Sequence, residues 1–168
     1  GYPNLVVQTP AVSPTSVTAG GSLSVSATLA NVGSFASAVG SVQCYLSANT
    51  TYEATDVSLG TIASNALAAN GTQAISGIVN IPSSTAAGAW YVLFRADATN
   101  TNTESNETDN LASAALTVTS GTIDLAPSSF SLSSTTIAKG SYFSTNTNII
   151  NNGTGTTGAS KFRVYFST

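Results

Sequence analysis

The sequence predicts an all-β protein, with one β-sandwich of about seven strands followed by the first strands of a second sandwich. Three observations favour this fold class. Apolar and polar residues alternate with period two in several short segments, and Gly, Pro, Asn and Ser separate these segments at intervals of roughly 8–12 residues. The chain also matches itself after a shift of 120 residues. No helix-length stretch keeps the apolar spacing of an amphipathic helix.

The first half of the expected sandwich contains four strands, at 4–8, 12–17, 22–30 and 41–47. The clearest is SLSVSATLA, whose apolar residues all fall on one face and whose hydroxyl residues fall on the other. The single cysteine, Cys44, lies in the alternating segment VQCYL. We expect it to be a small buried core residue, because a reactive thiol needs a neighbouring base or cation and the chain has no histidine.

The second half supplies four further strands, at 56–62, 74–82, 89–97 and 111–118. In AWYVLFRAD, Trp90 begins one phase of the alternation and Tyr91 begins the other. We expect Trp90 to fill the core beneath the opposite sheet. The functional alternative is an aromatic residue that stacks on sugar, for which Tyr91 or Tyr52 would be better placed if they face outward.

The internal repeat divides the chain. Between positions 4–48 and 124–168, nine of 45 residues are identical, including Asn31 and Asn151. The first domain is therefore expected to span residues 1–120, and an incomplete second repeat to span 121–168. Three strands cannot bury both faces of a sandwich. This predicts either that the chain is a piece of a longer array, which we favour, or that a neighbouring chain completes the half-domain by strand addition.

The composition excludes several classes of function. Charged residues make up 7% of the 168 residues and the net charge is −3, whereas 26 Ser, 25 Thr and 14 Asn give a neutral polar surface. Four scattered basic residues do not form the cationic patch that nucleic acid needs. No apolar run is long enough to insert into a membrane. Without histidine, a cysteine cluster or a glycine-rich phosphate loop, we expect no enzyme activity.

One acidic segment, ESNETDN at 104–110, contains three of the seven acidic residues. It falls in the connection between the strands at 89–97 and 111–118. The structural interpretation is a loop whose carboxylates and amides bond nearby backbone N–H groups. The functional interpretation is a calcium site, because Ca²⁺ takes six to eight oxygen ligands. The candidate ligands are Asp97, Glu104, Asn106, Glu107 and Asp109.

A weaker calcium candidate lies after the strand at 41–47. Its oxygen-bearing side chains are Asn49, Thr51, Glu53 and Asp56, and the first three have a spacing seen in some calcium loops. The segment lacks the following glycine and the terminal bidentate glutamate of an EF-hand. Calcium is the only cofactor that the sequence suggests, and the two segments need not share one end of the sandwich.

Several segments, in this order, resemble one known family. They are NLVV, VSPTSVTAGGSLSVSATLANVGS, CYLSANTTYEATDVSLGT, GAWYVLFRAD and ESNETDN. This pattern is similar to the bacterial cell-adhesion-related domain, CARDB, over residues 4–118, with the first part of a second copy at 124–168. The resemblance implies an Ig-like or fibronectin-like β-sandwich, often in tandem, in secreted and surface proteins. It implies no reaction.

These observations predict a non-catalytic extracellular module: an adhesion or spacer segment of a tandem-repeat surface protein, stalk or filament. Its expected partners are neighbouring repeats or other copies of the chain. One alternative is an accessory domain of a secreted hydrolase that binds a surface glycan or protein, with exposed aromatics as its platform: Tyr2, Tyr45, Tyr52 and Tyr91. Another is a self-assembling filament subunit whose half-domain is completed by a neighbouring chain.

Overall fold

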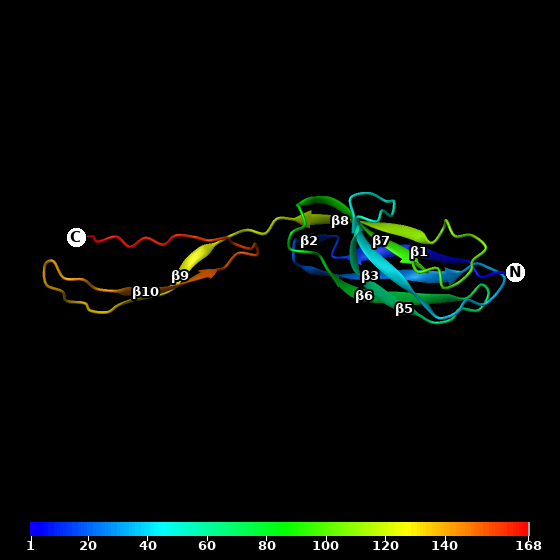
Figure 1. Cartoon of the computed structure of the whole chain (residues 1–168), viewed down its shortest axis with the longest axis horizontal. Helices are drawn as coiled ribbons and strands as arrows, with labels where there is room; N and C mark the ends of the chain where they lie inside the picture. Colours follow the sequence, from blue (N-terminus) through cyan, green and yellow to red (C-terminus); the bar gives the residue numbers. More distant parts are fainter. Residues whose placement is uncertain (168) are drawn as a thin grey trace. The chain divides into compact units, whose positions relative to one another are not determined.

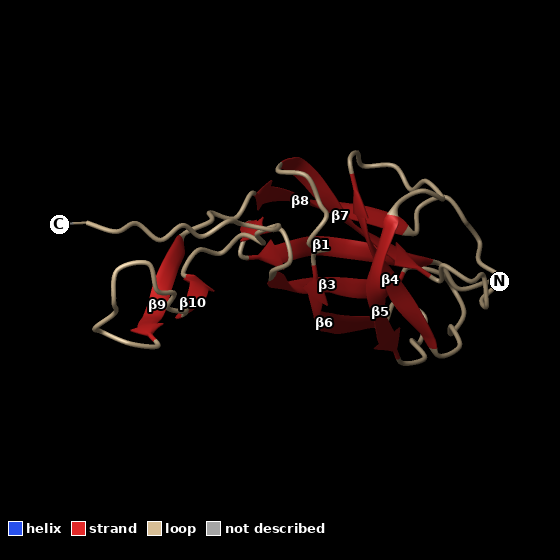
Figure 2. Ribbon diagram, turned by 60° about the vertical axis from the view of Figure 1, so that its left-hand side comes forward, coloured by secondary structure: helices blue, strands red, loops and turns tan. Residues whose placement is uncertain are grey.

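The computed structural model describes residues 1–167 and divides into two compact units, unit 1 (Gly1–Thr119) and unit 2 (Ser120–Thr168). The all-β prediction is confirmed: the regular structure of the described residues consists of strands (Figure 2). Within residues 1–167, no helix has the length and apolar character that crossing a membrane requires.

Unit 1 is a β-sandwich of two sheets (Figure 1). The smaller sheet has the antiparallel order β1-β3-β6, and the larger has the order β2-β8-β7-β4-β5. In the larger sheet β2 pairs with β8 in parallel, and the other neighbours are antiparallel. The strands are β1 (Leu5–Ser13), β2 (Ser16–Thr18), β3 (Ser22–Asn31), β4 (Gly40–Ser47), β5 (Val57–Ser64), β6 (Thr72–Asn80), β7 (Gly88–Ala96) and β8 (Leu111–Thr119).

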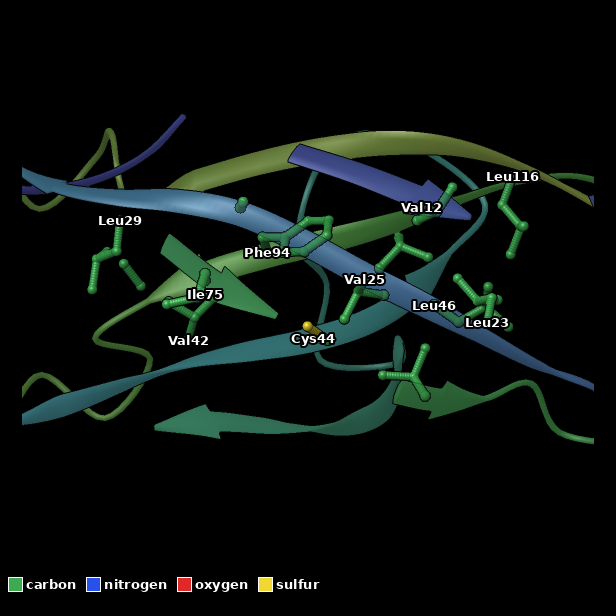
Figure 3. Packing of buried hydrophobic residues seen from close by; sticks show 14 of the residues in the cluster. Val12, Leu23, Val25, Leu29, Val42, Cys44, Leu46, Ile75, Phe94 and Leu116 are labelled. Carbon is green, nitrogen blue, oxygen red and sulfur yellow. The ribbon is translucent and has the colours of Figure 1, made fainter. Parts of the chain in front are cut away.

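The inner faces of the two sheets form one apolar core (Figure 3). The period-two faces predicted for β3, β4 and β7 are buried, and Phe94 is the largest fully buried side chain. Each such side chain stabilises the fold by about 1.5–3 kcal/mol through removal of its apolar surface from water. Trp90 lies at the margin of this core, half-buried, and its indole N–H donates to the carbonyl of Ala86 at 2.9 Å.

The N-terminal strands differ from the expected ranges. We predicted strands at 4–8 and 12–17, whereas β1 continues from Leu5 through a bulge between Gln8 and Ala11 to Ser13, and β2 begins only at Ser16. The bulge resets the alternation that had suggested two strands. The chain then changes sheets, because β1 pairs with β3 and β2 pairs with β8. Residues 5–18 therefore run along the sandwich in one direction while contacting both sheets.

Unit 2 repeats the first hairpin of unit 1. Its strands β9 (Leu125–Leu132) and β10 (Thr145–Asn151) are antiparallel, and Leu125 lies opposite Asn151 as Leu5 lies opposite Asn31. The expected third strand is not formed, since residues 161–167 have no regular secondary structure. The equivalent strand of unit 1, β4, is held between β5 and β7. Residues 120–167 contain no counterpart of those two strands.

Candidate functional site

The acidic segment lies where the chain enters unit 1. The β7–β8 connection, residues 97–110, packs against the N-terminal residues, and Ser105 donates its backbone N–H to the carbonyl of Pro3 at 2.9 Å. The loop can reach these residues because β8 begins beside the start of β1, at the same end of the sandwich (Figure 1). Its side chains therefore act between two chain segments that are about a hundred positions apart.

Glu104 is the central side chain of this contact. It is 7% exposed, and its carboxylate accepts hydrogen bonds from the Leu5 backbone N–H at 2.5 Å and from the Asn110 amide at 2.9 Å. Burial away from water raises the pKa of Glu104 above its ordinary value. The two hydrogen bonds oppose this shift, whereas the nearby charges of Glu107 and Asp97 add to it. The side chain ties the first residue of β1 to the loop.

Asp97 organises the beginning of the same loop. Its backbone has a positive φ of 41°, and its side chain is buried. One carboxylate oxygen accepts from the backbone N–H and the hydroxyl of Thr101, at 3.0 and 2.5 Å. The other accepts from the backbone N–H of Asn102 at 2.7 Å. Asp97 thus satisfies the backbone donors of a tight turn, as Asp side chains commonly do.

The remaining predicted residues hold the loop to Asn4 and to itself. Asn106 donates its backbone N–H to the Asn4 side-chain oxygen at 3.2 Å, and the Asn4 amide donates to Asp109 at 3.0 Å. Glu107 accepts from the backbone N–H of Glu104 at 2.9 Å. Asn4 therefore connects two positions of ESNETDN, Asn106 and Asp109. Of the predicted residues in this segment, Glu104, Asn106 and Asp109 bond the N-terminal residues, and Glu107 bonds within the loop.

Four buried asparagines complete the arrangement, and sequence reasoning did not assign them to the site: Asn4, Asn31, Asn102 and Asn110. Asn31 accepts the backbone N–H of Asn4 at 3.0 Å and fixes the entry of the chain into β1. The repeat carried a signal for Asn31, since Asn151 occupies the equivalent position. The other three give no sequence signal: Asn4 directly precedes β1, and Asn102 and Asn110 lie in a polar loop that looks like any exposed turn.

Two of the candidate calcium ligands already accept hydrogen bonds with both carboxylate oxygens. Both carboxylate oxygens of Asp97 and of Glu104 already accept N–H or O–H donors. Two buried side-chain oxygens, Asp109 Oδ1 and Asn110 Oδ1, have no donor within the described residues. Among residues 1–167, no three acidic, histidine or cysteine residues are grouped as metal ligands. No cofactor is therefore established by the geometry.

The weaker candidate group lies at the opposite end of the sandwich. Strand β4 ends at Ser47 opposite Tyr91, whereas β7 ends at Ala96 opposite Val42. The two loops that follow these strands are therefore separated by the length of the ladder and cannot share one ion. The side chains of the loop after β4 bond within it: Asn49 accepts the Thr51 N–H at 2.8 Å, and Asp56 accepts the Glu53 N–H at 2.8 Å.

Two of the aromatic candidates for a sugar platform contact each other within the domain. Tyr45 on β4 and Tyr52 in the following loop have ring centroids 4.7 Å apart, at an interplanar angle of 54°. The guanidinium of Arg95 on β7 lies 4.6 Å from the centroid of the Tyr52 ring. This cation–π contact fixes the loop over the outer face of the large sheet. Tyr2 is the candidate that unit 1 leaves most exposed, at 54%.

Fold and loop together define a β-sandwich module whose buried polar side chains hold loops and strand ends in place. The chain belongs to the CARDB family, whose profile matches residues 2–114. This confirms the family predicted from the sequence. CARDB is a non-enzymatic type of domain, found in surface-type proteins.

Comparison with solved structures supports the fold. The chain is similar to the CARDB domain of a Pyrococcus furiosus protein, solved in complex with di-metal ions, with 19% identity and a TM-score of 0.53. The match covers 70% of this chain and 94% of that one. It is also similar to a domain of a surface-type protein of Methanosarcina acetivorans, with 18% identity, a TM-score of 0.52, and coverage of 71% and 94%. A comparison with curated proteins gave no match.

Proposed function

We propose that this chain is a non-catalytic spacer or adhesion segment of a tandem-repeat protein on the outside of the cell, in a stalk or filament. The observation that carries the proposal is the recurrence of the β1–β3 strand pair, with the asparagine that ends its second strand, as β9–β10 after 120 residues. Tandem copies of one sandwich build length without a catalytic site. The surface is rich in neutral Ser, Thr and Asn, so it offers few charges for nonspecific electrostatic association.

The test is to locate the native protein in its source cells. Antibodies raised against unit 1 should label intact, unpermeabilised cells, and the labelled polypeptide should be removed by external protease. Immunoblots should show a species that carries further repeats or an oligomer of this chain. Labelling only after permeabilisation would overturn the proposal. A cytosolic protein of known location, probed in the same samples, is the control for membrane integrity.

A second candidate is a self-assembling subunit whose unit 2 is completed by a neighbouring copy. The exposed apolar face of unit 2 favours it. Leu125 is 39% exposed where its repeat equivalent Leu5 is 2% exposed, and Ile149 is 40% exposed where Leu29 is 1% exposed. Apolar side chains in these core positions gain from any complementary sheet that covers them. Light scattering of the 168-residue chain tests this directly, with residues 1–119 alone as the control. A strict monomer with protease-sensitive residues 123–168 would exclude self-completion.

A further inference from the structure

The N-terminal ribbon, residues 5–19, and strand β8 run in the same direction along unit 1. Strand β2 pairs with β8 in parallel, with Ser16 opposite Thr117 and Thr18 opposite Thr119. The pairing extends beyond both ends of β2, because Thr117 donates to the carbonyl of Thr15 at 2.9 Å and Ala19 donates to that of Thr119 at 3.0 Å. The chain therefore enters unit 1 at one end and leaves from the other (Figure 1).

This geometry determines how tension acts on the hydrogen bonds. A force that separates Gly1 from Thr119 pulls the ribbon towards its N-terminal end and pulls β8 towards its C-terminal end. Because the two strands are parallel, these forces oppose each other along the strand axis, across the inter-strand hydrogen bonds. The bonds must then break together. The antiparallel β1–β3 pair is loaded in the same way, since β1 is drawn lengthwise past β3.

Residues 3–5, at the start of the ribbon, are also bonded to segments beside them. The Leu5 and Asn4 backbone N–H groups donate to the buried side chains of Glu104 and Asn31. Ser105 donates its N–H to Pro3, and the Asn4 amide donates to Asp109. These contacts prevent β1 from being peeled outward from its first residue. Tension is therefore transmitted along the ribbon, where the paired strands resist it together.

We infer that unit 1 is a mechanical clamp, in which the parallel β2–β8 pair and the side-chain contacts of residues 3–5 resist tension between the two ends of the domain. This inference rests on the proposed function, because a spacer in a stalk or filament is stretched from end to end. It adds a mechanical role to ESNETDN: the segment secures the point at which force enters the fold.

Single-molecule pulling in two geometries tests the clamp. The full chain, with Cys44 replaced by Ala, is held by a handle at Gly1 and by a thiol at Ser120→Cys. Complete unfolding between these points releases roughly 400 Å of chain, which identifies unit 1 as the element that breaks. In the control the handles are Ser84→Cys and Ser120→Cys, both at the exit end, since Ile81 accepts the Gly20 N–H beside Ala19. That geometry peels β8 from its last residue, one hydrogen bond at a time.

The clamp predicts a rupture force several-fold higher for the end-to-end geometry than for the peeling geometry, at the same loading rate. Similar forces in the two geometries, with equal thermal stability of the two handle variants, would overturn it. Replacing Glu104 by Gln should lower the end-to-end force and leave the peeling force unchanged; a loss in both would assign Glu104 to general stability instead. None of these results depends on where the native protein resides, so failure of the clamp and failure of the proposed function are separate outcomes.

Discussion

Asn31 and Asn151 occupy equivalent positions in the two repeats and make the same three hydrogen bonds. The Asn31 oxygen accepts the N–H groups of Asn4 and Gly33 at 3.0 and 3.1 Å, and its amide donates to the Phe35 carbonyl at 2.7 Å. The Asn151 oxygen accepts from Asp124 and Gly153 at 3.0 Å each, and its amide donates to Gly155 at 2.6 Å. An asparagine amide thus closes the strand pair in both repeats, fully buried in unit 1 and partly buried in unit 2.

The two asparagines should nevertheless differ in their energetic effect. The Asn31 amide also donates to the carbonyls of Leu67 and Ala68, at 3.0 and 3.2 Å, in the loop before β6. Replacing Asn31 by Ala leaves several buried groups without partners and should lower the free energy of unfolding of unit 1 by about 3 kcal/mol. The measurement is urea unfolding followed by Trp90 fluorescence.

Asn151→Ala is the matched control for that experiment. It removes the equivalent amide from unit 2 and should leave the Trp90 transition unchanged, because Trp90 belongs to unit 1. Equal losses in the two variants would contradict the view that Asn31 acts within its own sandwich. An unaffected Asn31→Ala variant would show that water replaces the lost bonds.

A second pair of equivalent residues tests the core. Leu29 is 1% exposed in unit 1, and its equivalent Ile149 is 40% exposed in unit 2. Leu29→Ala should cost about 3 kcal/mol, since it removes buried methyl groups and leaves a cavity. Ile149→Ala should change the stability of the 168-residue chain by less than about 0.5 kcal/mol, as expected for a surface site. A large cost at Ile149, with concentration dependence, would instead support completion of unit 2 by a neighbouring copy.

The sequence predicted the strands more reliably than it predicted the role of the acidic loop. Alternation in SLSVSATLA and AWYVLFRAD predicted β3 and β7 to within two residues, because a sheet buried on one face imposes period two on the sequence. The bulge between Gln8 and Ala11 broke that period, so the sequence pattern placed a strand boundary inside β1. The function of ESNETDN was harder to predict. Its composition suits a calcium loop and a loop of structural hydrogen bonds equally, and no sequence pattern shows that Glu104 lies beside Leu5.

The thiol of Cys44 should be unreactive in the folded protein. It is fully buried, and burial raises its pKa to about 11. At pH 8 a pKa of about 11 leaves only about one thiol in a thousand as thiolate. A disulfide-exchange reagent should therefore label Cys44 at the rate of unfolding, and 6 M urea should make labelling fast. Rapid labelling without denaturant would contradict the buried position. Cys44→Ser should destabilise more than Cys44→Ala, because it buries an additional hydroxyl group.

Calcium should not stabilise unit 1 measurably. The carboxylates of Asp97 and Glu104 are already used by N–H and O–H donors, so an ion would have to displace hydrogen bonds that hold the loop. The midpoint of thermal unfolding should be the same in 5 mM calcium and in excess chelator, to within about 1 °C. A rise with calcium that disappears in Asp109→Asn would show instead that the loop rearranges into a metal site. Asp56→Asn serves as the control at the opposite end of the sandwich.

Titration of Glu104 should make the free energy of unfolding of unit 1 depend on pH. Burial raises the pKa of this carboxyl in the folded state above 4.5, so the folded state binds the proton more tightly than the unfolded state does. Its contribution to stability is therefore fully present below pH 4.5 and is lost as pH rises through the folded-state pKa.

The variant Glu104→Gln provides the comparison, because its side chain is neutral at every pH. Relative to this variant, the wild type should become more stable as pH falls from 8 to 4, as measured by urea unfolding. Carbon-13 NMR of the Glu104 carboxyl should show the same elevated midpoint. A midpoint at or below 4.5 would mean that the Leu5 and Asn110 hydrogen bonds outweigh burial.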